Sequence, residues 1–367
     1  MITNELLTAF GLDLDEYEVL EIKTGHINDT FFVHNKKLSS ETGYIFQRVN
    51  TYVFKEPEKV MFNIEKVSEH LKLKLDKDCG VDDYRQMLFF LNTPNGKNYY
   101  VDSENGFWRA YTYVDKAFTY DYPSTMEVLF LMGERFGQFQ NDLADFDANT
   151  LYETIPNFHN TKARIERFKQ VMAEDKFDRV KDAKAEIEYL LSAADMASEL
   201  SIMIEEKRIP LRVTHNDTKC NNVLFDKETL KPVAVIDLDT IMPGLSAYDF
   251  GDAIRTAGST AAEDEPDVSK VHVDLDRYEA FTKGFVSKVA ENLTQIEIES
   301  LALGAFTMTY EVGLRFLTDY FEGDVYFKTK YDGHNLVRAR TQIALAKDIQ
   351  LHFDEMKEIV RKYGKKD

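Results

Sequence analysis

The stretch that decides the fold is residues 211–239, LRVTHNDTKCNNVLFDKETLKPVAVIDLD. It reads as a short apolar strand, a polar loop, a second short strand, a turn and a β-branched strand. The loop has the spacing His-x-Asp-x-x-x-x-Asn from His215 to Asn222, and the last strand stops at Asp237. Asn and Asp are common turn formers, which explains one or two of these residues but not the whole pattern. The expected strands are 211–213, 223–225 and 233–236, with the turn at 226–229.

These residue types fit phosphoryl transfer from ATP. The reaction needs a carboxylate that accepts the proton of the attacking hydroxyl, and oxygen ligands for the Mg²⁺ that sits on the phosphates. We expect Asp217 to be the base, and Asn222 and Asp237 to be the metal ligands. Lys219 is expected to neutralise charge on the γ-phosphate, with a solvated loop lysine as the alternative. Asp239 is either a second metal contact or a residue that shapes the loop.

The loop resembles the catalytic loop that protein kinases share with the aminoglycoside-phosphotransferase and choline-kinase superfamily. Longer strings are similar to the bacterial N-acetylhexosamine 1-kinases, in the same order along nearly the whole chain. These strings are GHIN (25–28), LRVTHNDTKCNN (211–222), IDLDTIMPG (236–244), VGLRFL (312–317), EGDVYF (322–327) and HNLVRARTQ (334–342).

The resemblance implies an α+β, protein-kinase-like fold with two lobes. A small antiparallel-sheet lobe that binds the nucleotide would cover residues 1–112. A larger, mainly helical lobe that carries the catalytic loop and binds the sugar would cover residues 113–367.

The resemblance also implies roles in binding the acceptor. It implies that His26, Arg315 and Tyr326 hold the sugar, and that Asp217 faces the anomeric hydroxyl. On the residues alone, His26 could be only a turn residue. Arg315 on its own would more simply form a helix-surface ion pair with Glu311 or Asp319, four residues away on either side, and the resemblance reverses that preference.

The strand expected at 44–49 departs from the kinase pattern. Kinases place a lysine there to hold the phosphates, whereas this strand offers Gln47 and Arg48. Arg48 can grip phosphate bidentately, but a register shift of one residue exchanges the two faces, so both stay candidates. Glu65, on a helix expected at 57–74, is the candidate partner or a solvated surface residue. By analogy, the backbone near Tyr113 pairs with adenine at the hinge.

Composition limits the classes of partner. A net charge of −19 argues against nucleic acid and anionic membranes, which reward basic patches. Two cysteines, Cys79 and Cys220, exclude a disulfide scaffold and suit a reducing compartment. The most apolar stretch, 301–317, contains Glu311 and Arg315 and is too short and polar to span a bilayer. We expect a soluble, cytoplasmic monomer without a signal peptide.

The remaining pattern predicts elements and assigns two further residues. Asp249, in a DFG string 27 residues after Asn222, is expected to cap the following helix and to brace the catalytic loop. His159 is expected to be structural. A capping box is expected at Thr294. The other expected elements are strands at 84–91, 99–101 and 107–114, helices at 126–143, 274–293, 294–321 and 335–361, and two long helices within 163–207.

The sequence hypothesis is an ATP- and Mg²⁺-dependent kinase that converts a free N-acetylhexosamine, of gluco or galacto configuration, into its 1-phosphate. The alternative within the superfamily is a choline, homoserine, methylthioribose or aminoglycoside kinase, since fold does not fix substrate. A cationic acceptor would want an acidic and aromatic cage. A catalytically dead, kinase-like binding module is disfavoured because Asp217 and Asp237 are both present.

Overall fold

The computed structural model describes residues 2–13, 15–22, 27–38, 42–75 and 82–364. The chain forms two compact units. The expected α+β composition, with a small antiparallel sheet and a larger helical part, is confirmed. The boundary between residues 112 and 113 stays a prediction. The first unit comprises Met1–Thr119, Asp145–Pro156 and Asn222–Pro243, and the second comprises Tyr120–Ala144, Asn157–Asn221 and Gly244–Asp367.

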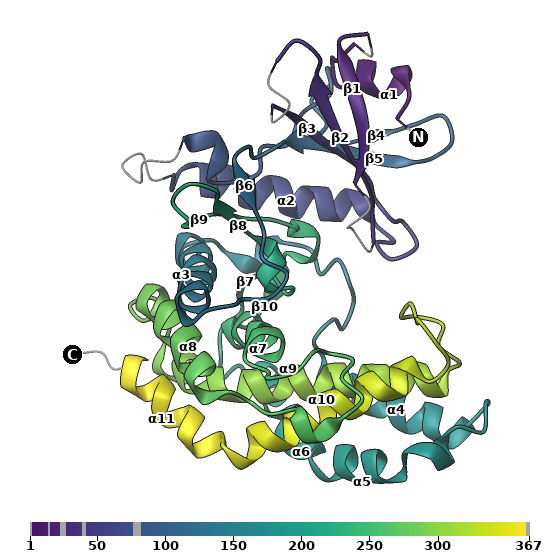
Figure 1. The fold of residues 1–367 in the computed structure, drawn as a ribbon, viewed down its shortest axis with the longest axis vertical. Helices are drawn as coiled ribbons and strands as arrows, with labels where there is room; N and C mark the ends of the chain where they lie inside the picture. The colour runs from purple at the N-terminus through teal and green to yellow at the C-terminus, as the bar shows by residue number, and fades with distance from the viewer. Residues whose placement is uncertain (1, 14, 23–26, 39–41, 76–81, 365–367) are drawn as a thin grey trace. The chain divides into compact units, whose positions relative to one another are not determined.

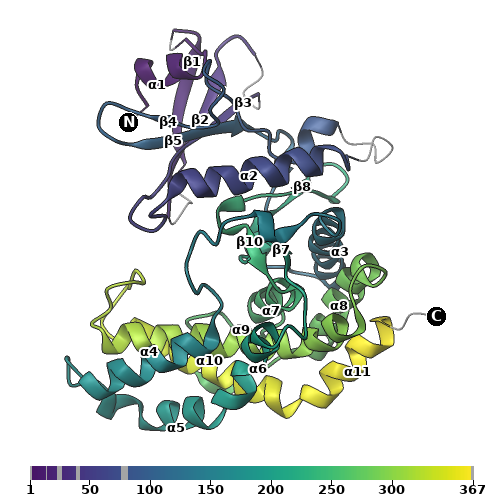
Figure 2. The same ribbon diagram turned by 180° about the vertical axis from the view of Figure 1, so that it is seen from behind.

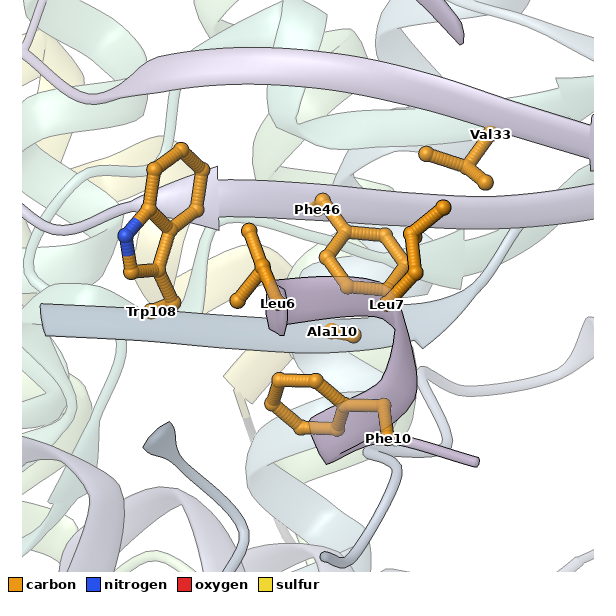
Figure 3. Packing of buried hydrophobic residues seen from close by; sticks show 7 residues of the cluster. All are labelled: Leu6, Leu7, Phe10, Val33, Phe46, Trp108 and Ala110. Carbon is orange, nitrogen blue, oxygen red and sulfur yellow. The ribbon is translucent and has the colours of Figure 1, made fainter. Parts of the chain in front are cut away.

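The main sheet of the first unit is antiparallel throughout, in the strand order β1-β2-β3-β5-β4. One face of it is covered by α1 (Asn4–Ala9), whose N-cap Thr3 accepts a hydrogen bond from the backbone of Leu6. Burying this helix against the sheet makes the core drawn in Figure 3, which comprises Leu6, Leu7, Phe10, Val33, Phe46, Trp108 and Ala110. The strands are β1 (Tyr17–Ile22), β2 (Asp29–Asn35), β3 (Gly43–Arg48), β4 (Tyr100–Val101) and β5 (Phe107–Thr112).

A second, three-stranded sheet of the first unit has the order β6-β8-β9. The helix α2 (Pro57–Lys72) holds two loops of the first unit, those that contain Tyr152 and Ile241. Its buried Asn63 donates from Nδ2 to the carbonyls of both residues, at 2.8 Å each. The elements are β6 (Ala117–Phe118), β8 (Val223–Asp226), β9 (Pro232–Val235), and the 3-10 helices η1 (Asp83–Arg85), η2 (Ala148–Thr150) and η5 (Leu238–Thr240).

The prediction of a strand at 84–91 is wrong. This segment begins as η1, and only Phe90 forms a bridge, with Tyr111. The reason is Arg85, whose buried guanidinium donates to the Asp226 carboxylate at 2.8 Å and to the carbonyls of Asp115 and Lys116. These bonds hold the segment in an irregular path that satisfies a buried charge instead of a strand ladder.

The second unit is built around α9 (Gln295–Phe321), which begins at the expected capping box of Thr294 and Glu297. Figures 1 and 2 both show α10 running beside α9. The helix α7 (Ser246–Ala257) crosses α9 in backbone contact, because a Cβ on Gly251 would overlap the carbonyl of Gly304. The other helices are α3 (Met126–Asp142), α4 (Thr161–Glu174), α5 (Lys184–Ser192), α6 (Ala194–Glu205), α8 (Leu275–Val289), α10 (His334–Leu351), α11 (Phe353–Gly364), η3 (Val180–Ala183) and η6 (Val268–Lys270).

Two helix predictions in this unit are wrong in number. The region 163–207 holds three α-helices instead of two, because Asp175 takes a left-handed conformation (φ 37°) and Ala193 leaves helical geometry. The last predicted helix is interrupted at His352 (φ −96°, ψ 13°). Residues 175–183 separate α4 from α5, whereas the breaks at Ala193 and His352 are single residues. A single-residue break leaves the apolar periodicity on both sides intact, so the pattern does not reveal it. Within the described ranges, no helix is long and apolar enough to cross a membrane.

Candidate functional site

The catalytic loop follows β7 (Arg212–Thr214) in the second unit. Asn216 adopts a left-handed conformation (φ 63°), which Asn tolerates better than most residues. The imidazole of His215 is fully buried and packs edge-on against Phe136 and Phe139, with ring centroids about 6 Å apart. Its Nδ1 accepts the N–H of Asp217 at 3.3 Å. His215 therefore shapes the loop from inside the unit, and the side chain of Asp217 is only half-buried.

Asp249 braces this loop from α7. Its Oδ1 accepts the N–H of Asn216 at 2.7 Å, and its Oδ2 accepts the N–H of His215 at 2.9 Å and Nε2 of Gln140 at 2.7 Å. Burial raises the pKa of Asp249, while the same hydrogen bonds oppose that rise. The predicted brace is confirmed. The predicted N-cap is wrong, because α7 already begins at Ser246 and Asp249 lies inside its first turn.

A second carboxylate of α7, Asp252, holds the next part of the loop. Its Oδ2 accepts the N–H of Thr218 at 3.0 Å, and Oδ1 accepts Nε of the buried Arg255 at 3.0 Å. The Nζ of Lys219 lies 2.7 Å from Oδ1 of Asp217. Burial on its own would lower the pKa of Lys219, but the charges of Asp217 and Asp252 outweigh it and raise that pKa. Lys219 is therefore charged at neutral pH.

In the first unit, the hairpin of β8 and β9 brings Asn222 and Asp237 to one end. Val223 pairs with Val235, and the carbonyl of Asn222 accepts the N–H of Ile236 at 2.9 Å. Asp237 then leaves the hairpin with φ 62°, a left-handed conformation. The 3-10 helix η4 (Cys220–Asn222) joins this end to the catalytic loop in sequence.

Asp239, two residues later, is held by side chains of the main sheet. Its carboxylate forms a buried ion pair with Arg109 of β5 and accepts Nδ2 of Asn28 at 2.7 Å. The Oε1 of Gln47 accepts Nε and Nη2 of Arg109 at 3.0 and 2.7 Å. Burial alone would lower the pKa of Arg109, but Asp239 and Asp237 raise it. Asp239 thus shapes the site, and Arg109 is the cation that lies within electrostatic range of Asp237.

Of the four nucleotide candidates, Gln47 belongs to this network, and Arg48, Glu65 and Tyr113 lie apart from it. Gln47 pairs across the sheet with Arg109, so both side chains share one face. Arg48 takes the opposite face, near Asp102. Glu65 is half-buried and forms no hydrogen bond or ion pair within the described ranges. The N–H of Tyr113 donates to the carbonyl of Gly43 at 3.0 Å. The geometry favours Gln47 over Arg48 on the Asp237 side, and the four nucleotide roles stay predictions.

Three aromatic rings surround Arg315 in the second unit. Its guanidinium carbon lies 5.3 Å from the ring centroid of Phe327, 5.7 Å from Tyr326 and 5.8 Å from Phe158. Such distances allow cation–π attraction. Arg315 is half-buried, and within the described ranges it forms no ion pair. We call Arg315 with these three rings the arginine cluster. His26, the other predicted sugar contact, lies outside the described residues.

The two acids that were possible partners of Arg315 have other roles. Glu311 accepts Oγ1 of Thr161 at 2.8 Å and contacts Nδ1 of His159 at 3.0 Å. Asp319 accepts backbone N–H groups of residues 325–327. The alternative role of Arg315, a surface ion pair, is therefore not formed in this part of the chain, and the structural role expected for His159 is consistent with its burial against Glu311.

Glu311 helps to hold the loop that contains Phe158. Arg164 lies 3.3 Å from Glu311 and donates from Nε to the carbonyl of Phe158 at 3.0 Å. Burial alone would raise the pKa of Glu311, but Arg164 and His159 lower it to about 2. Burial and the nearby charge of Arg315 lower the pKa of Arg164 to about 10.

Sequence reasoning missed Arg109 and Phe158. The signal for Arg109 was a single cation within the aromatic strand FWRAYT. Its partner Asp239 is 130 positions away in the chain, so only the fold identifies the pair. Phe158 stands next to His159 in a segment without helix or strand, and nothing in its spacing links it to Arg315.

The side chains at the hairpin end fit a magnesium ion. Asn222 and Asp237 both carry oxygen donors, while Asp239 is already committed to Arg109 and Asn28. Mg²⁺ is usually held by one or two carboxylates together with substrate phosphates. A donor set of one carboxylate and one amide suits an ion that arrives with a nucleotide.

Comparison with known proteins gives the family. The model of the phosphotransferase enzyme family (APH) matches residues 18–285. An aminoglycoside phosphotransferase from Alicyclobacillus acidocaldarius is similar in structure, with TM-score 0.64, 11% identity, and coverage of 99% of this chain and 97% of that one. A microcompartment-associated aminopropanol kinase has TM-score 0.60 and 14% identity, covering 96% of this chain and 97% of that one. A spectinomycin phosphotransferase solved with ADP and spectinomycin has TM-score 0.55 and 13% identity, with coverage of 96% and 97%.

At these identities the similar structures speak for the fold alone, and they confirm the kinase-like fold expected from the sequence. The family match covers well over half of the chain and includes the whole catalytic loop. The protein belongs to the APH phosphotransferase enzyme family.

Proposed function

We propose that the protein is an ATP- and Mg²⁺-dependent kinase that phosphorylates a free N-acetylhexosamine, GlcNAc or GalNAc, on its anomeric hydroxyl. The observation that carries this proposal is the arginine cluster. It combines one cation, which forms no ion pair within the described ranges, with three aromatic faces.

This cluster suits a neutral, polyhydroxylated acceptor. The guanidinium of Arg315 carries five N–H donors, which can serve ring hydroxyls or the carbonyl of an acetamido group. The rings of Tyr326 and Phe158 offer apolar faces for the carbon side of a sugar. A cationic acceptor such as choline or an aminoglycoside would meet a like charge instead, because Glu311 and Asp319 are already occupied by other partners.

The nucleotide part of the proposal rests on the first unit. Asn222 and Asp237 would hold Mg²⁺, which when bound neutralises charge on the phosphates and orients them. Gln47 and Arg109 lie on the face of the sheet that also carries the contact to Asp239, so they are our candidates for steering the phosphates. Nothing in this assignment requires Arg48.

In the proposed reaction, Asp217 accepts the proton of the anomeric hydroxyl. The anomeric oxygen forms a bond to the γ-phosphorus, the bond from that phosphorus to the bridging oxygen breaks, and ADP leaves with the electron pair. Lys219, which is 2.7 Å from Asp217, neutralises charge on the transferred group. The braces Asp249 and Asp252 fix the loop before substrate arrives, which lowers the cost of ordering it during reaction.

The test is an acceptor screen with purified protein, ATP and Mg²⁺. ADP release is followed with GlcNAc, GalNAc, choline, homoserine, methylthioribose and an aminoglycoside, and each sugar product is then assayed for its reducing end. We expect ADP release with an N-acetylhexosamine together with loss of the reducing end, since phosphate on C1 removes the free aldehyde. The Asp217→Asn variant is the control, and it should retain nucleotide binding without turnover.

Other outcomes would reject the proposal. ADP release with the reducing end intact would place the phosphate on another carbon. Turnover of choline or an aminoglycoside in preference to both sugars would assign the protein to another kinase of the superfamily, and would contradict the use of Arg315 as an acceptor contact.

A further inference from the structure

We propose that Asp319 is a positioning residue of the acceptor site, because it holds the backbone of residues 325–327 so that Tyr326 and Phe327 face Arg315. This inference rests on the proposed function insofar as the arginine cluster is taken to receive the acceptor. Asp319 itself is not proposed to touch substrate.

The geometry is that of one buried carboxylate gripping a short run of backbone. Oδ1 of Asp319 accepts the N–H of Val325 at 3.0 Å and of Tyr326 at 2.8 Å. Oδ2 accepts the N–H of Phe327 at 2.9 Å and Nδ2 of Asn335, also at 2.9 Å. The side chain of Asp319 is only 3% exposed, so these four donors are its environment.

The gripped segment contains no regular secondary structure, and just beyond it the carbonyl of Lys328 accepts Nη1 of Arg338 at 3.2 Å. The segment lies between the end of α9 at Phe321 and the start of α10 at His334, and residues 322–330 contain no helix or strand. The side chains of Val325 and Tyr326 are 72% and 61% exposed, so burial does not hold them. Phe327 alone packs inward, on Phe316, with ring centroids 4.6 Å apart. Without the carboxylate, the backbone that carries Tyr326 would be free to move.

Other contacts hold Asp324, near the start of the segment, rather than residues 325–327, which we call its aromatic tip. Asp324 pairs with Arg179 at 2.6 Å and accepts Nδ2 of Asn335 at 2.9 Å. None of these contacts involves the backbone of residues 325–327. Asp324 has a left-handed backbone (φ 61°), a conformation in which Asn is as comfortable as Asp. It therefore offers a matched control, which is the same substitution at a nearby carboxylate that does not accept the N–H groups of residues 325–327.

The placement of Asp319 explains why it acts on acceptor binding in particular. It lies four residues after Arg315 on α9, a spacing at which an acid and an arginine often form an ion pair. Asp319 instead holds the backbone of Tyr326 and Phe327, whose rings lie beside Arg315. One helix thus presents the donor group and orients two of the three rings around it. Changing Asp319 should move the rings relative to Arg315 without altering either the catalytic loop or the nucleotide residues of the first unit.

The kinetic experiment compares Asp319→Asn with Asp324→Asn, using the acceptor that the screen identifies. An amide keeps one acceptor oxygen but turns N–H donors toward the remaining backbone N–H groups. We expect Asp319→Asn to raise the KM for the acceptor about tenfold or more while the KM for ATP changes less than about twofold, the size expected for one lost charged hydrogen bond. Asp324→Asn should leave both values near wild type. Equal changes in both KM values, or no change in the acceptor KM, would overturn the proposal.

A double-mutant cycle then separates positioning from general stability. If Asp319 acts through the aromatic tip, Asp319→Asn should add little to the acceptor KM in a Tyr326→Ala background, because the ring to be positioned is already gone. Full additivity of the two changes would mean that Asp319 does not act through Tyr326.

Hydrogen exchange tests the grip without any substrate. In the wild-type protein, the amides of Val325, Tyr326 and Phe327 should exchange at least about tenfold more slowly than an unstructured chain, although their segment is exposed. Exchange at unstructured rates would refute the grip. This measurement also covers the case in which Asp319→Asn does not fold. If no N-acetylhexosamine is phosphorylated but these amides are protected, the proposed acceptor is wrong and the grip stands.

Discussion

Asp249→Asn is the substitution that tests most directly whether α7 holds the catalytic loop in place. The two oxygens of Asp249 accept the N–H groups of His215 and Asn216, and both oxygens receive only N–H donors. An asparagine has the same shape but one oxygen fewer. Whichever way the amide is turned, its NH₂ group faces a backbone N–H that it cannot satisfy.

The magnitude follows from the least costly orientation. With the amide oxygen toward His215 and Gln140, only the N–H of Asn216 loses its acceptor. A hydrogen bond to a charged group contributes about 1.5–3 kcal/mol, and a buried N–H left without a partner costs about 1–3 kcal/mol. A loss of about 2–3 kcal/mol that falls on the loop geometry corresponds to about a 30- to 160-fold fall in kcat. The KM for ATP should change little.

The assay is ADP release at saturating ATP and acceptor, paired with urea unfolding of the same preparations. Gln140→Leu is the matched control. It removes the third donor to Asp249 but leaves both loop N–H groups paired. We expect this variant to lose stability, by about 1 kcal/mol, with kcat within about threefold of wild type.

Two results would refute the reasoning. If Asp249→Asn turns over at nearly the wild-type rate, the loop does not depend on this carboxylate. If Gln140→Leu loses as much kcat as Asp249→Asn, the effect comes from general destabilisation of the unit and not from the loop.

The remaining predictions concern Arg315, the ion pair of Arg109 with Asp239, the carboxylate of Glu311, and Cys220, which is the one cysteine among the described residues. Arg315→Ala should raise the acceptor KM about tenfold or more with the ATP KM unchanged, and an unaltered acceptor KM would return Arg315 to a structural role. Arg109→Ala leaves Asp239 buried without its ion-pair partner and should cost about 3–5 kcal/mol in urea unfolding; a loss below about 1 kcal/mol would contradict the buried pair. Glu311 has a folded pKa of about 2, below its unfolded value of 4.5, so its stabilisation is complete above pH 4.5 and is lost as the pH falls toward 2. It amounts to about 3 kcal/mol, and Glu311→Gln should flatten this acid limb in pH-dependent unfolding, whereas an unchanged slope would assign the limb to other acids. Burial raises the pKa of Cys220 to about 12, so peptide mapping after iodoacetamide treatment at pH 7.5 should show almost no label on this residue in the folded protein, and rapid labelling would contradict its burial.

The parts of the fold that sequence predicted well are those in which a local pattern is sufficient. The capping box at Thr294 needs only residues three positions apart, and the strands flanking the catalytic loop are short apolar runs bounded by turn formers. The end of the β8–β9 hairpin could likewise be expected to carry Asn222 and Asp237, because a tight hairpin leaves few ways to pair its strands.

The parts that sequence could not predict depend on contacts between distant segments. Whether Gln47 or Arg48 shares a face with Asp239 depends on the register of a strand, and the structure fixes it by pairing Gln47 with Arg109. The role of Asp319 is equally invisible in the chain, since a helix position four residues from an arginine suggests an ion pair. In both cases a buried polar group needed a partner, and its partner came from elsewhere in the unit.

The backbone contact between Gly251 and Gly304 links the catalytic loop to the proposed acceptor residues. It fixes α7, which carries Asp249, directly against α9, which carries Arg315, with no side chain between them that could be enlarged or trimmed. A larger residue at either glycine would force the two helices apart, because its Cβ would overlap a backbone carbonyl of the other helix. Such a change would displace Asp249 and Arg315 relative to one another, so the brace of the loop and the proposed acceptor contact would be disturbed together.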